Sequence, residues 1–229
     1  MAKRISITIP TLNEAANIGP ALERLQPLRA RGHEVIVVDG GSTDDTKRRA
    51  GPHADQVIDA PRGRAAQMNA GAEHAHGDVL LFLHADTVLP AQADRLILDG
   101  MRASKRGWGR FDIRIDGQHW LLPLIALGMN LRSRLTGVCT GDQCIFVSRE
   151  LFLRVGGYPA IALMEDIALT KRLRRASPPL RLSAPVVTSS RRWERNGVVR
   201  TMLFMWSLRL RYFFGASPAR LARLYDPEA

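Results

Sequence analysis

Cysteine is scarce in this chain, which has only Cys139 and Cys144 among its 229 residues. Two cysteines are too few for a disulfide framework, and the chain lacks the paired Cys/His spacing of a structural zinc site. We therefore expect both to be small, reduced residues of the core. With 45% hydrophobic and 24% charged residues, the chain can bury one sizeable core but is too short for two large domains.

Long hydrophobic runs are also missing. The apolar segment 120–131 is short and contains Pro123, and arginines in the tail leave residues 201–208 as its longest uninterrupted apolar stretch. Because a membrane-spanning helix needs roughly 20 apolar residues, we expect neither segment to cross a bilayer. The first residues run into the alternating segment 5–9 without an apolar signal region, which predicts a cytoplasmic protein.

The formal net charge of +11 predicts attraction to polyanions: nucleic acid, an anionic membrane face or the phosphates of a small substrate. Charge alone does not choose among them. The chain contains no internal repeat, no low-complexity linker and no G-x-G-x-x-G fingerprint in its glycine-containing turn 39–45. Asp44 and Asp45 would also repel a pyrophosphate at the following helix, so this turn is not a dinucleotide site.

The first ninety residues alternate short apolar runs with polar turns and helical stretches, which predicts a parallel, doubly wound half-sheet. The expected strands are 5–9, 34–38, 56–59 and 79–83, and the expected helices are 13–29, 43–50 and 63–75. Ligands bind such sheets at the carboxyl ends of the strands.

The second half of the chain has an α+β pattern. The expected strands are 109–115, 143–147 and 185–188, and the expected helices are 91–103, 165–175 and 197–214. We divide the chain into a domain of residues 1–193 and a basic, amphipathic helical tail of residues 194–229.

Three polar groups follow the expected strands. The Thr11-Leu12-Asn13-Glu14 segment follows the first, and either reads a ligand ring or, through Asn13, caps the next helix. Asp39 ends the second strand, where it either accepts hydrogen bonds from a nucleobase or holds a turn. Arg64 opens the next helix, where its guanidinium suits a phosphate or is a solvated surface group.

Three acids and a basic aromatic cluster complete the set. Asp86 ends an apolar strand, where it either holds Mg²⁺ or Mn²⁺ against a diphosphate or forms a capping turn. Glu165 and Asp166 begin a helix; the dipole favours both, and only one can face a reacting hydroxyl as its base. The Arg191-Arg192-Trp193 cluster offers phosphate donors or internal cation–π packing.

The order of these motifs resembles that of family 2 glycosyltransferases of the A-type fold. The shared motifs span residues 5–193 and are P-T-L-N-E, V-V-D-G-G-S-T-D-D-T, the apolar strand ending in H-A-D, M-E-D and R-R-W. The resemblance implies an α/β, Rossmann-like, mostly parallel sheet flanked by helices. The G-D-Q block and basic C-terminal helix are further similar to a small bacterial subgroup labelled arsenosugar-biosynthesis glycosyltransferases.

The resemblance also implies roles for individual residues. Nucleotide-sugar binding falls to Thr11, Leu12, Glu14, Asp39, Arg64, His84, Ala85 and Asp86. Asp86 would ligate a bridging Mn²⁺ or Mg²⁺, and Asp166 would be the base of an inverting transfer from a UDP-linked sugar to a hydroxyl. Gly141, Asp142, Gln143, Glu165, Arg192 and Trp193 would border the acceptor and the leaving group.

Two positions depart from the family pattern. His84 replaces the first acid of the metal motif, so Asp86 must supply the main protein ligand. Ser189 stands where the family usually has a glutamine, three residues before Arg192. Because processive synthases carry the full motif together with membrane spans, we expect a non-processive enzyme.

Other functions compete with this interpretation. A sugar nucleotidyltransferase would normally show a glycine-rich phosphate loop near its N-terminus, and none is present. A non-catalytic module could instead use the basic, aromatic tail to bind a membrane surface. We expect no nucleic-acid partner, and an acceptor that is either a small molecule or lipid-linked. The tail would pack on its own domain, form a homodimer or contact the inner face of the membrane.

Overall fold

The computed structural model of the protein describes residues 3–225. Its centre is an eight-stranded sheet with the order β3-β2-β1-β4-β7-β6-β8-β5. The strands are β1 (Ile5–Thr11), β2 (Glu34–Asp39), β3 (Gln56–Asp59), β4 (Val79–Phe82), β5 (Thr87–Val88), β6 (Trp108–Ile115), β7 (Phe146–Ser148) and β8 (Leu180–Thr188). Strands β3, β2, β1 and β4 are parallel neighbours, which confirms the predicted half-sheet.

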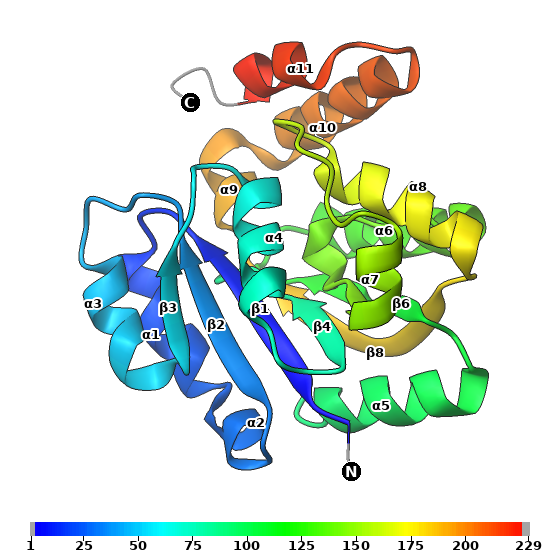
Figure 1. Ribbon diagram of the computed structural model, residues 1–229. Helices are drawn as coiled ribbons and strands as arrows, with labels where there is room; N and C mark the ends of the chain where they lie inside the picture. Colours follow the sequence, from blue (N-terminus) through cyan, green and yellow to red (C-terminus); the bar gives the residue numbers. More distant parts are fainter. Residues whose placement is uncertain (1–2, 226–229) are drawn as a thin grey trace.

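Helices cover both faces of this sheet (Figure 1). They are α1 (Ala15–Glu23), α2 (Gln26–Ala30), α3 (Thr46–Ala50), α4 (Arg64–His74), α5 (Ala93–Ser104), α6 (Leu121–Thr136), α7 (Arg149–Arg154), α8 (Glu165–Ala176), α9 (Arg191–Asn196), α10 (Val198–Phe213) and α11 (Pro218–Tyr225). Short 3₁₀ turns lie at Gly51–His53 and Gly141–Gln143. The predicted boundary between residues 193 and 194 falls inside α9.

The central strands are buried on both faces because alternate side chains point to opposite sides of a strand. Val35 and Val37 of β2 belong to a core cluster that contains Leu22 of α1. Ile36 and Val38 of the same strand belong to a second cluster on the other face, which contains residues of α4, α7 and α8. The near-continuous apolar runs of the sequence are therefore explained by two buried layers.

The helical tail packs over the segment that precedes α8. Leu208 of α10 and Leu221 of α11 form a third cluster with Leu163, Met164 and Ile167. Figure 1 shows both tail helices above the end of the sheet where α4 begins. Within the described residues 3–225, no helix combines the length and the apolar content needed to span a bilayer.

The predicted helix over residues 13–29 is wrong in one respect, because the segment forms two helices. Pro27 has no N–H group to donate to the carbonyl of Glu23, where α1 ends, and lies instead in the first turn of α2, where no such donor is needed. The helix expected over 43–50 is shortened to α3, since the Asp44 carboxylate accepts hydrogen bonds from the N–H groups of Ala15 and Thr46 and so holds the preceding turn.

The second half also differs from the prediction. The strand expected over 143–147 is β7 at 146–148, because Cys144 takes a left-handed conformation (φ 48°) after the 3₁₀ turn. Helix α7 was not predicted, although its Ser148 side chain accepts a hydrogen bond from the N–H of Leu151 as an N-cap. The last strand begins at Leu180 rather than at residue 185.

Gly109 of β6 allows the close approach of β6 and β8. A Cβ atom at this position would lie 2.3 Å from the Leu180 carbonyl oxygen and 2.5 Å from the Phe146 ring. We expect Gly109→Ala to lower the free energy of unfolding by roughly 2–3 kcal/mol in urea denaturation, since backbone must move. Gly128→Ala in α6 meets nothing within 4 Å and should instead add about 0.5–1 kcal/mol. Equal stabilities for the two variants would contradict this account.

Candidate active site

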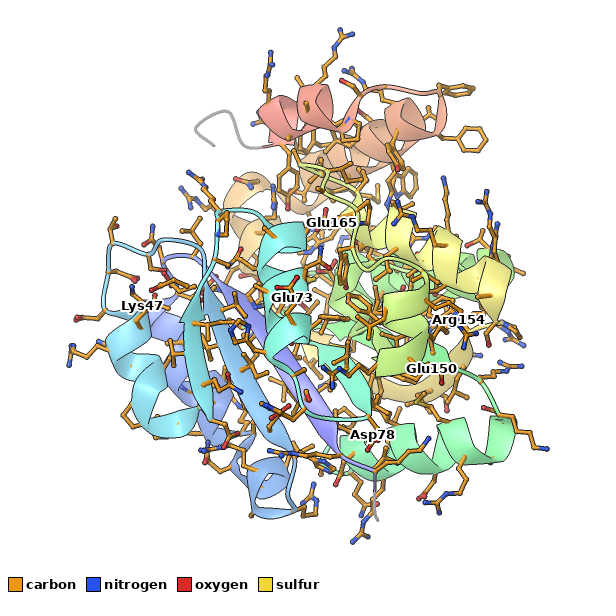
Figure 2. All side chains as sticks on the ribbon, in the orientation of Figure 1. Lys47, Glu73, Asp78, Glu150, Arg154 and Glu165 are labelled. Carbon is orange, nitrogen blue, oxygen red and sulfur yellow. The ribbon has the colours of Figure 1, made fainter. Side chains whose placement is uncertain are left out.

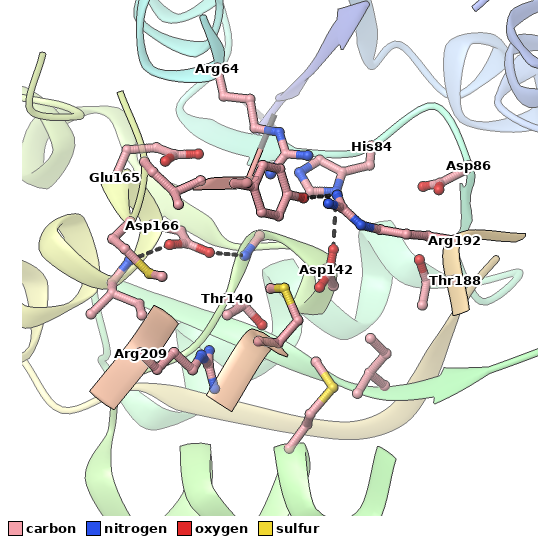
Figure 3. A pocket seen from close by; sticks show the side chains of 18 of the residues that line it. Arg64, His84, Asp86, Thr140, Asp142, Glu165, Asp166, Thr188, Arg192 and Arg209 are labelled. Atoms are coloured by element: carbon pink, nitrogen blue, oxygen red, sulfur yellow. Dashed lines mark hydrogen bonds and ion pairs between the residues drawn. The ribbon is translucent and has the colours of Figure 1, made fainter. Parts of the chain in front are cut away.

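Two adjoining cavities lie where the carboxyl ends of β1 and β4 meet helices α4, α8, α9 and α11. We call the one beside β1 the strand-end cavity and the one beside α8 and α9 the inner cavity. The strand-end cavity is lined by Thr11, Leu12, Glu14 and Ala85, the inner cavity by Gly141, Asp142, Asp166, Arg192 and Trp193, and both by Arg64, His84, Asp86 and Glu165. Figure 3 shows the inner cavity, with Asp86 and Asp166 on opposite sides of Asp142. The structure thus brings most of the predicted site residues together.

Asp39 holds the turn after β2 and lines neither cavity among the described residues. It is fully buried, and its Oδ2 accepts hydrogen bonds from the N–H groups of Gly41 (3.0 Å) and Ser42 (2.7 Å). The Thr11 hydroxyl lies 3.4 Å from its Oδ1. Of the two roles that the sequence left open for Asp39, the geometry supports the turn. Its contact with a nucleoside stays a prediction.

Gln143 is fully buried and points toward α6 rather than into either cavity. Its amide nitrogen donates to the Ser133 hydroxyl at 3.0 Å and to Asn130 Oδ1 at 3.3 Å. It therefore anchors the 140–144 loop, and its neighbours Gly141 and Asp142 are the residues that reach the inner cavity.

Gln67 of α4 is a residue that the sequence analysis missed. Its side-chain nitrogen donates to the carbonyl oxygens of Thr11 and Val38, each at 2.8 Å. One amide thus ties the carboxyl ends of β1 and β2 together. A single glutamine in a helix of small residues gives no sequence signal for such a role, because both acceptors are backbone groups distant along the chain.

Asp166 lies at the start of α8 with both carboxylate oxygens engaged. Oδ2 accepts from the N–H of Gly141 at 2.9 Å, and Oδ1 accepts from the N–H of Ile167 at 2.6 Å. Burial raises the pKa of Asp166, the two N–H groups oppose that shift, and the charge of Asp142 adds to it. A carboxylate with a raised pKa is a stronger proton acceptor at neutral pH.

Glu165 is buried beside Asp166, and only 5% of it is exposed. Burial, together with the charge of Asp166, raises the pKa of Glu165 to about 7, against the opposing attraction of Arg64. Figure 2 shows Glu165 among side chains beneath the tail helices, whereas Lys47 and Arg154 lie at the periphery of the molecule. Burial thus raises the pKa of both adjacent acids of α8.

His84 and Asp142 form a polar pair in the middle of the cavity. His84 Nδ1 lies 3.3 Å from Asp142 Oδ1, and the buried His84 Nε2 has no hydrogen-bond partner among the described residues. Gly141 packs against the same ring, since a Cβ atom there would lie 2.8 Å from His84 Nε2. The 140–144 loop and the end of β4 are thus fixed against one another.

Asp86 is the carboxylate that fits a divalent cation. Its side chain is 34% exposed, and its oxygens lie 3.3 Å from the Thr87 hydroxyl and 4.0 Å from Arg191 Nη2. No group of three or more metal-ligating side chains occurs within residues 3–225. Mg²⁺ is commonly held by one or two carboxylates plus substrate phosphates, so a single partly exposed acid where the two cavities meet is a fitting donor set.

Tyr225, the last described residue, lies inside the site. The guanidinium carbon of Arg192 is 3.8 Å from the centre of the Tyr225 ring, and Arg192 Nη1 donates to the Tyr225 hydroxyl. Tyr225 lines both cavities. No role was expected for this residue, because a tail that starts beyond the motifs offers no signal for which of its aromatic side chains folds back.

The geometry is that of a sugar-transferring enzyme of the A-type fold, and the family model for glycosyl transferase family 2 matches residues 6–148. This match covers more than half of the chain. The chain belongs to glycosyl transferase family 2.

Relatives match parts of the chain. It is 39% identical over 102 residues to a PGL/p-HBAD biosynthesis glycosyltransferase of Mycobacterium bovis, an alignment that covers 42% of this chain and 40% of that protein. The chain thus spans less than half the length of this curated relative. None of the relatives and structures described here supports the narrower arsenosugar-biosynthesis likeness.

Two solved structures share the fold. A mannosyltransferase, PcManGT of Pyrobaculum calidifontis, in complex with GDP-Man and Mn²⁺, gives a TM-score of 0.60 at 24% identity, covering 82% of this chain and 57% of that one. Glucosyl-3-phosphoglycerate synthase of Mycobacterium tuberculosis, in complex with Mn²⁺, UDP and glucosyl-3-phosphoglycerate, gives a TM-score of 0.58 at 22% identity. The match covers 80% of this chain and 71% of that one. At these identities the likeness shows the fold alone.

The raised pKa of Glu165 predicts a pH-dependent stability. Its protonated form is favoured in the folded protein, so its contribution is present below the ordinary pKa of 4.5 and is lost as the pH rises through about 7. We expect the free energy of unfolding of the wild type to lose roughly 3 kcal/mol from this group over that range. Glu165→Gln should lack this loss in urea denaturation between pH 4.5 and 8. Parallel profiles for the two proteins would contradict the assignment.

Proposed function

We propose that the chain transfers a sugar from a nucleoside diphosphate sugar, UDP-linked, to an acceptor hydroxyl with inversion. The observation that carries this proposal is the convergence of Asp86, Asp166 and the cations Arg64 and Arg192 on one pair of joined cavities. Carboxylates suited to a metal and to a proton, with guanidinium groups between them, are what a departing diphosphate and an attacking hydroxyl require.

The strand-end cavity suits the nucleoside. Thr11, Leu12 and Glu14 line its wall, and Arg64 stands where it joins the inner cavity. The two structural neighbours carry GDP-Man or UDP together with Mn²⁺, which supports a nucleoside diphosphate and a divalent cation for this chain as well. We choose UDP as the nucleotide because the sequence resemblance implies it and because the synthase structure contains it.

Asp86 would hold Mn²⁺ or Mg²⁺. When bound, the cation supplies positive charge against the diphosphate that leaves. His84, in place of an acid, is paired with Asp142, so in this proposal it orients the 140–144 loop and Asp86 alone supplies the protein carboxylate.

Asp166 is the base in this proposal. Its two oxygens are oriented by the N–H groups of Gly141 and Ile167, and its pKa is raised. It accepts the proton of the acceptor hydroxyl as that oxygen attacks the sugar from the side opposite the diphosphate, and a single displacement of this kind inverts the anomeric centre. Arg192, whose Nη1 donates to a phenol oxygen, presents the same donor to a phosphate oxygen.

The alternatives have weaker support. A nucleotidyltransferase lacks its glycine-rich loop in this sequence, and a non-catalytic module would not need buried acids with raised pKa values at the end of the sheet. We retain residues 1–193 as the catalytic domain and residues 194–229 as the tail, of which residues 226–229 lie outside the described residues. Membrane contact by the tail, or a homodimer through it, remains a proposal.

Asp166→Asn tests the base. The amide is similar in size but cannot accept the proton, so we expect transfer to fall by roughly 10²–10⁴-fold while donor binding persists. A thermal-shift screen of nucleotide sugars with and without Mn²⁺ first identifies the donor. Release of the nucleoside diphosphate then measures turnover, with Asp99→Asn on the exposed face of α5 as the matched control. Wild-type turnover by Asp166→Asn would reject the assignment.

Asp86→Ala tests the metal ligand. For the wild type, calorimetry should show tighter UDP binding when Mn²⁺ is present. In the variant, the gain in UDP affinity that Mn²⁺ gives should be smaller by about tenfold or more, the lower end of the effect of disturbing a metal site. The variant's affinity for UDP without Mn²⁺ should not fall, because the substitution then removes only a negative charge that repels the diphosphate. An unchanged response to Mn²⁺ would show that another group holds the cation.

A further inference from the structure

An apolar groove of about 710 Å³ lies between α6 and α10. Its walls include Leu121, Leu124 and Ile125 from α6 and Met202, Trp206 and Phe213 from α10. The volume lies within the range of ordinary ligand sites. The groove is separate from the strand-end cavity, with which it shares no lining residue among those described.

The groove is continuous with the inner cavity. Thr140, Asp142, Trp193 and Arg209 are among the residues that line both. Figure 3 shows Thr140 and Arg209 on the same side of the inner cavity, below Asp166. A molecule lying in the groove can therefore present one end to the base.

The polar end of the groove carries a net positive charge, because two arginines and one carboxylate, that of Asp142, line it. Arg132 of α6 and Arg209 of α10 both line it, and no hydrogen bond or ion pair within residues 3–225 engages either side chain. Arg132 Nη2 and the Thr140 hydroxyl are buried without a hydrogen-bond partner among these residues. Buried donors of this kind are costly unless a ligand satisfies them, and guanidinium groups favour anionic oxygens.

The surface around the groove is apolar. Leu124 and Leu127 of α6 are 55% and 62% exposed, and Trp206 and Phe213 of α10 are 62% and 75% exposed. Contiguous apolar surface of this kind marks an interaction site rather than ordinary solvent-facing surface. A chain of methylene groups, entering from an apolar phase, matches both the walls of the groove and its rim.

We propose that the α6–α10 groove is the acceptor subsite, and that it takes an amphiphilic lipid with an apolar chain and an anionic, hydroxyl-bearing head group. The apolar part of the lipid lies between α6 and α10, its anionic group is bound by Arg132 and Arg209, and its hydroxyl reaches Asp166. This inference rests on the proposed function and names the class of its acceptor.

A second copy of the chain fits the groove less well. In a symmetric dimer the same patch meets itself, so the groove arginines of one copy would be buried close to those of the other. Two arginines and one carboxylate, that of Asp142, line each groove, so the two facing patches would both carry a net positive charge. That repulsion opposes such an interface, whereas an anionic head group neutralises it.

Gly128 gives a variant that fills the groove. It lies on the groove-facing side of α6, and a Cβ atom there meets nothing within 4 Å. Gly128→Trp should therefore occupy the space of the lipid chain without displacing core atoms, and Gly128→Ala is its matched control. Arg132→Gln and Arg209→Gln remove the anion donors, with Arg134→Gln, which does not line the groove, as the control.

Calorimetry with three probes tests the proposal. Decanoyl lysophosphatidic acid has an acyl chain, a phosphate and a hydroxyl group. Monodecanoin lacks the phosphate, and glycerol 3-phosphate lacks the acyl chain. We expect the first to bind at least tenfold more tightly than either fragment. Gly128→Trp should weaken its binding at least tenfold and the two arginine variants should bring it close to monodecanoin, while Gly128→Ala and Arg134→Gln bind like the wild type.

Equal binding of all three probes, or no effect of Gly128→Trp, would overturn the proposal. So would sedimentation showing a dimer that Gly128→Trp dissociates and lysophosphatidic acid does not. UDP binding with Mn²⁺ is measured on the same samples. A wild type that does not bind UDP with Mn²⁺ would refute the proposed function. A wild type that binds UDP but not lysophosphatidic acid would refute only the acceptor class.

Discussion

The hydrogen bond from the N–H of Gly141 to Asp166 is the constraint on which the site depends. The same glycine packs against the ring of His84, with no room for a side chain. One residue thus links the segment after β4, which carries His84 and Asp86, to the start of α8, which carries Asp166. Asp166 is held by backbone N–H groups, whereas the contacts of the Asp86 carboxylate are with the side chains of Thr87 and Arg191.

The buried sheet makes this arrangement rigid. Gln67 joins the ends of β1 and β2 from one face, and the side chains of β2 alternate between two separate apolar layers. A shift of one residue in a strand would exchange the two layers, so the register of the strands is strongly specified. The positions of the loops that follow them are consequently specified as well.

The sequence could predict the elements whose information is local. The parallel strands over 5–9, 34–38 and 79–83 were visible because buried strands are continuous apolar runs, and Asp86 and Asp166 were visible through the motif order. The break at Pro27 was also local, and was missed because the apolar pattern continues through it. The roles of Gln67 and Tyr225 could not be predicted, since each contacts residues distant along the chain. Gln143 contacts Ser133 and Asn130 on the preceding helix, and the family motif instead suggested that it faced the acceptor.

Tyr225 has a consequence for how the tail and the nucleotide influence each other. Its phenol takes a hydrogen bond from Arg192 and is stacked under the guanidinium group that we assign to the diphosphate. If Arg192 binds the diphosphate of the donor, its contact with Tyr225 of α11 must break. Donor binding and the release of α11 are therefore coupled in free energy. By thermodynamic reciprocity, a partner that displaces α11 would raise the affinity for the donor by a given factor, and the donor would raise the affinity for that partner by the same factor. Helix α11 would then act as an effector element built into the enzyme's own polypeptide.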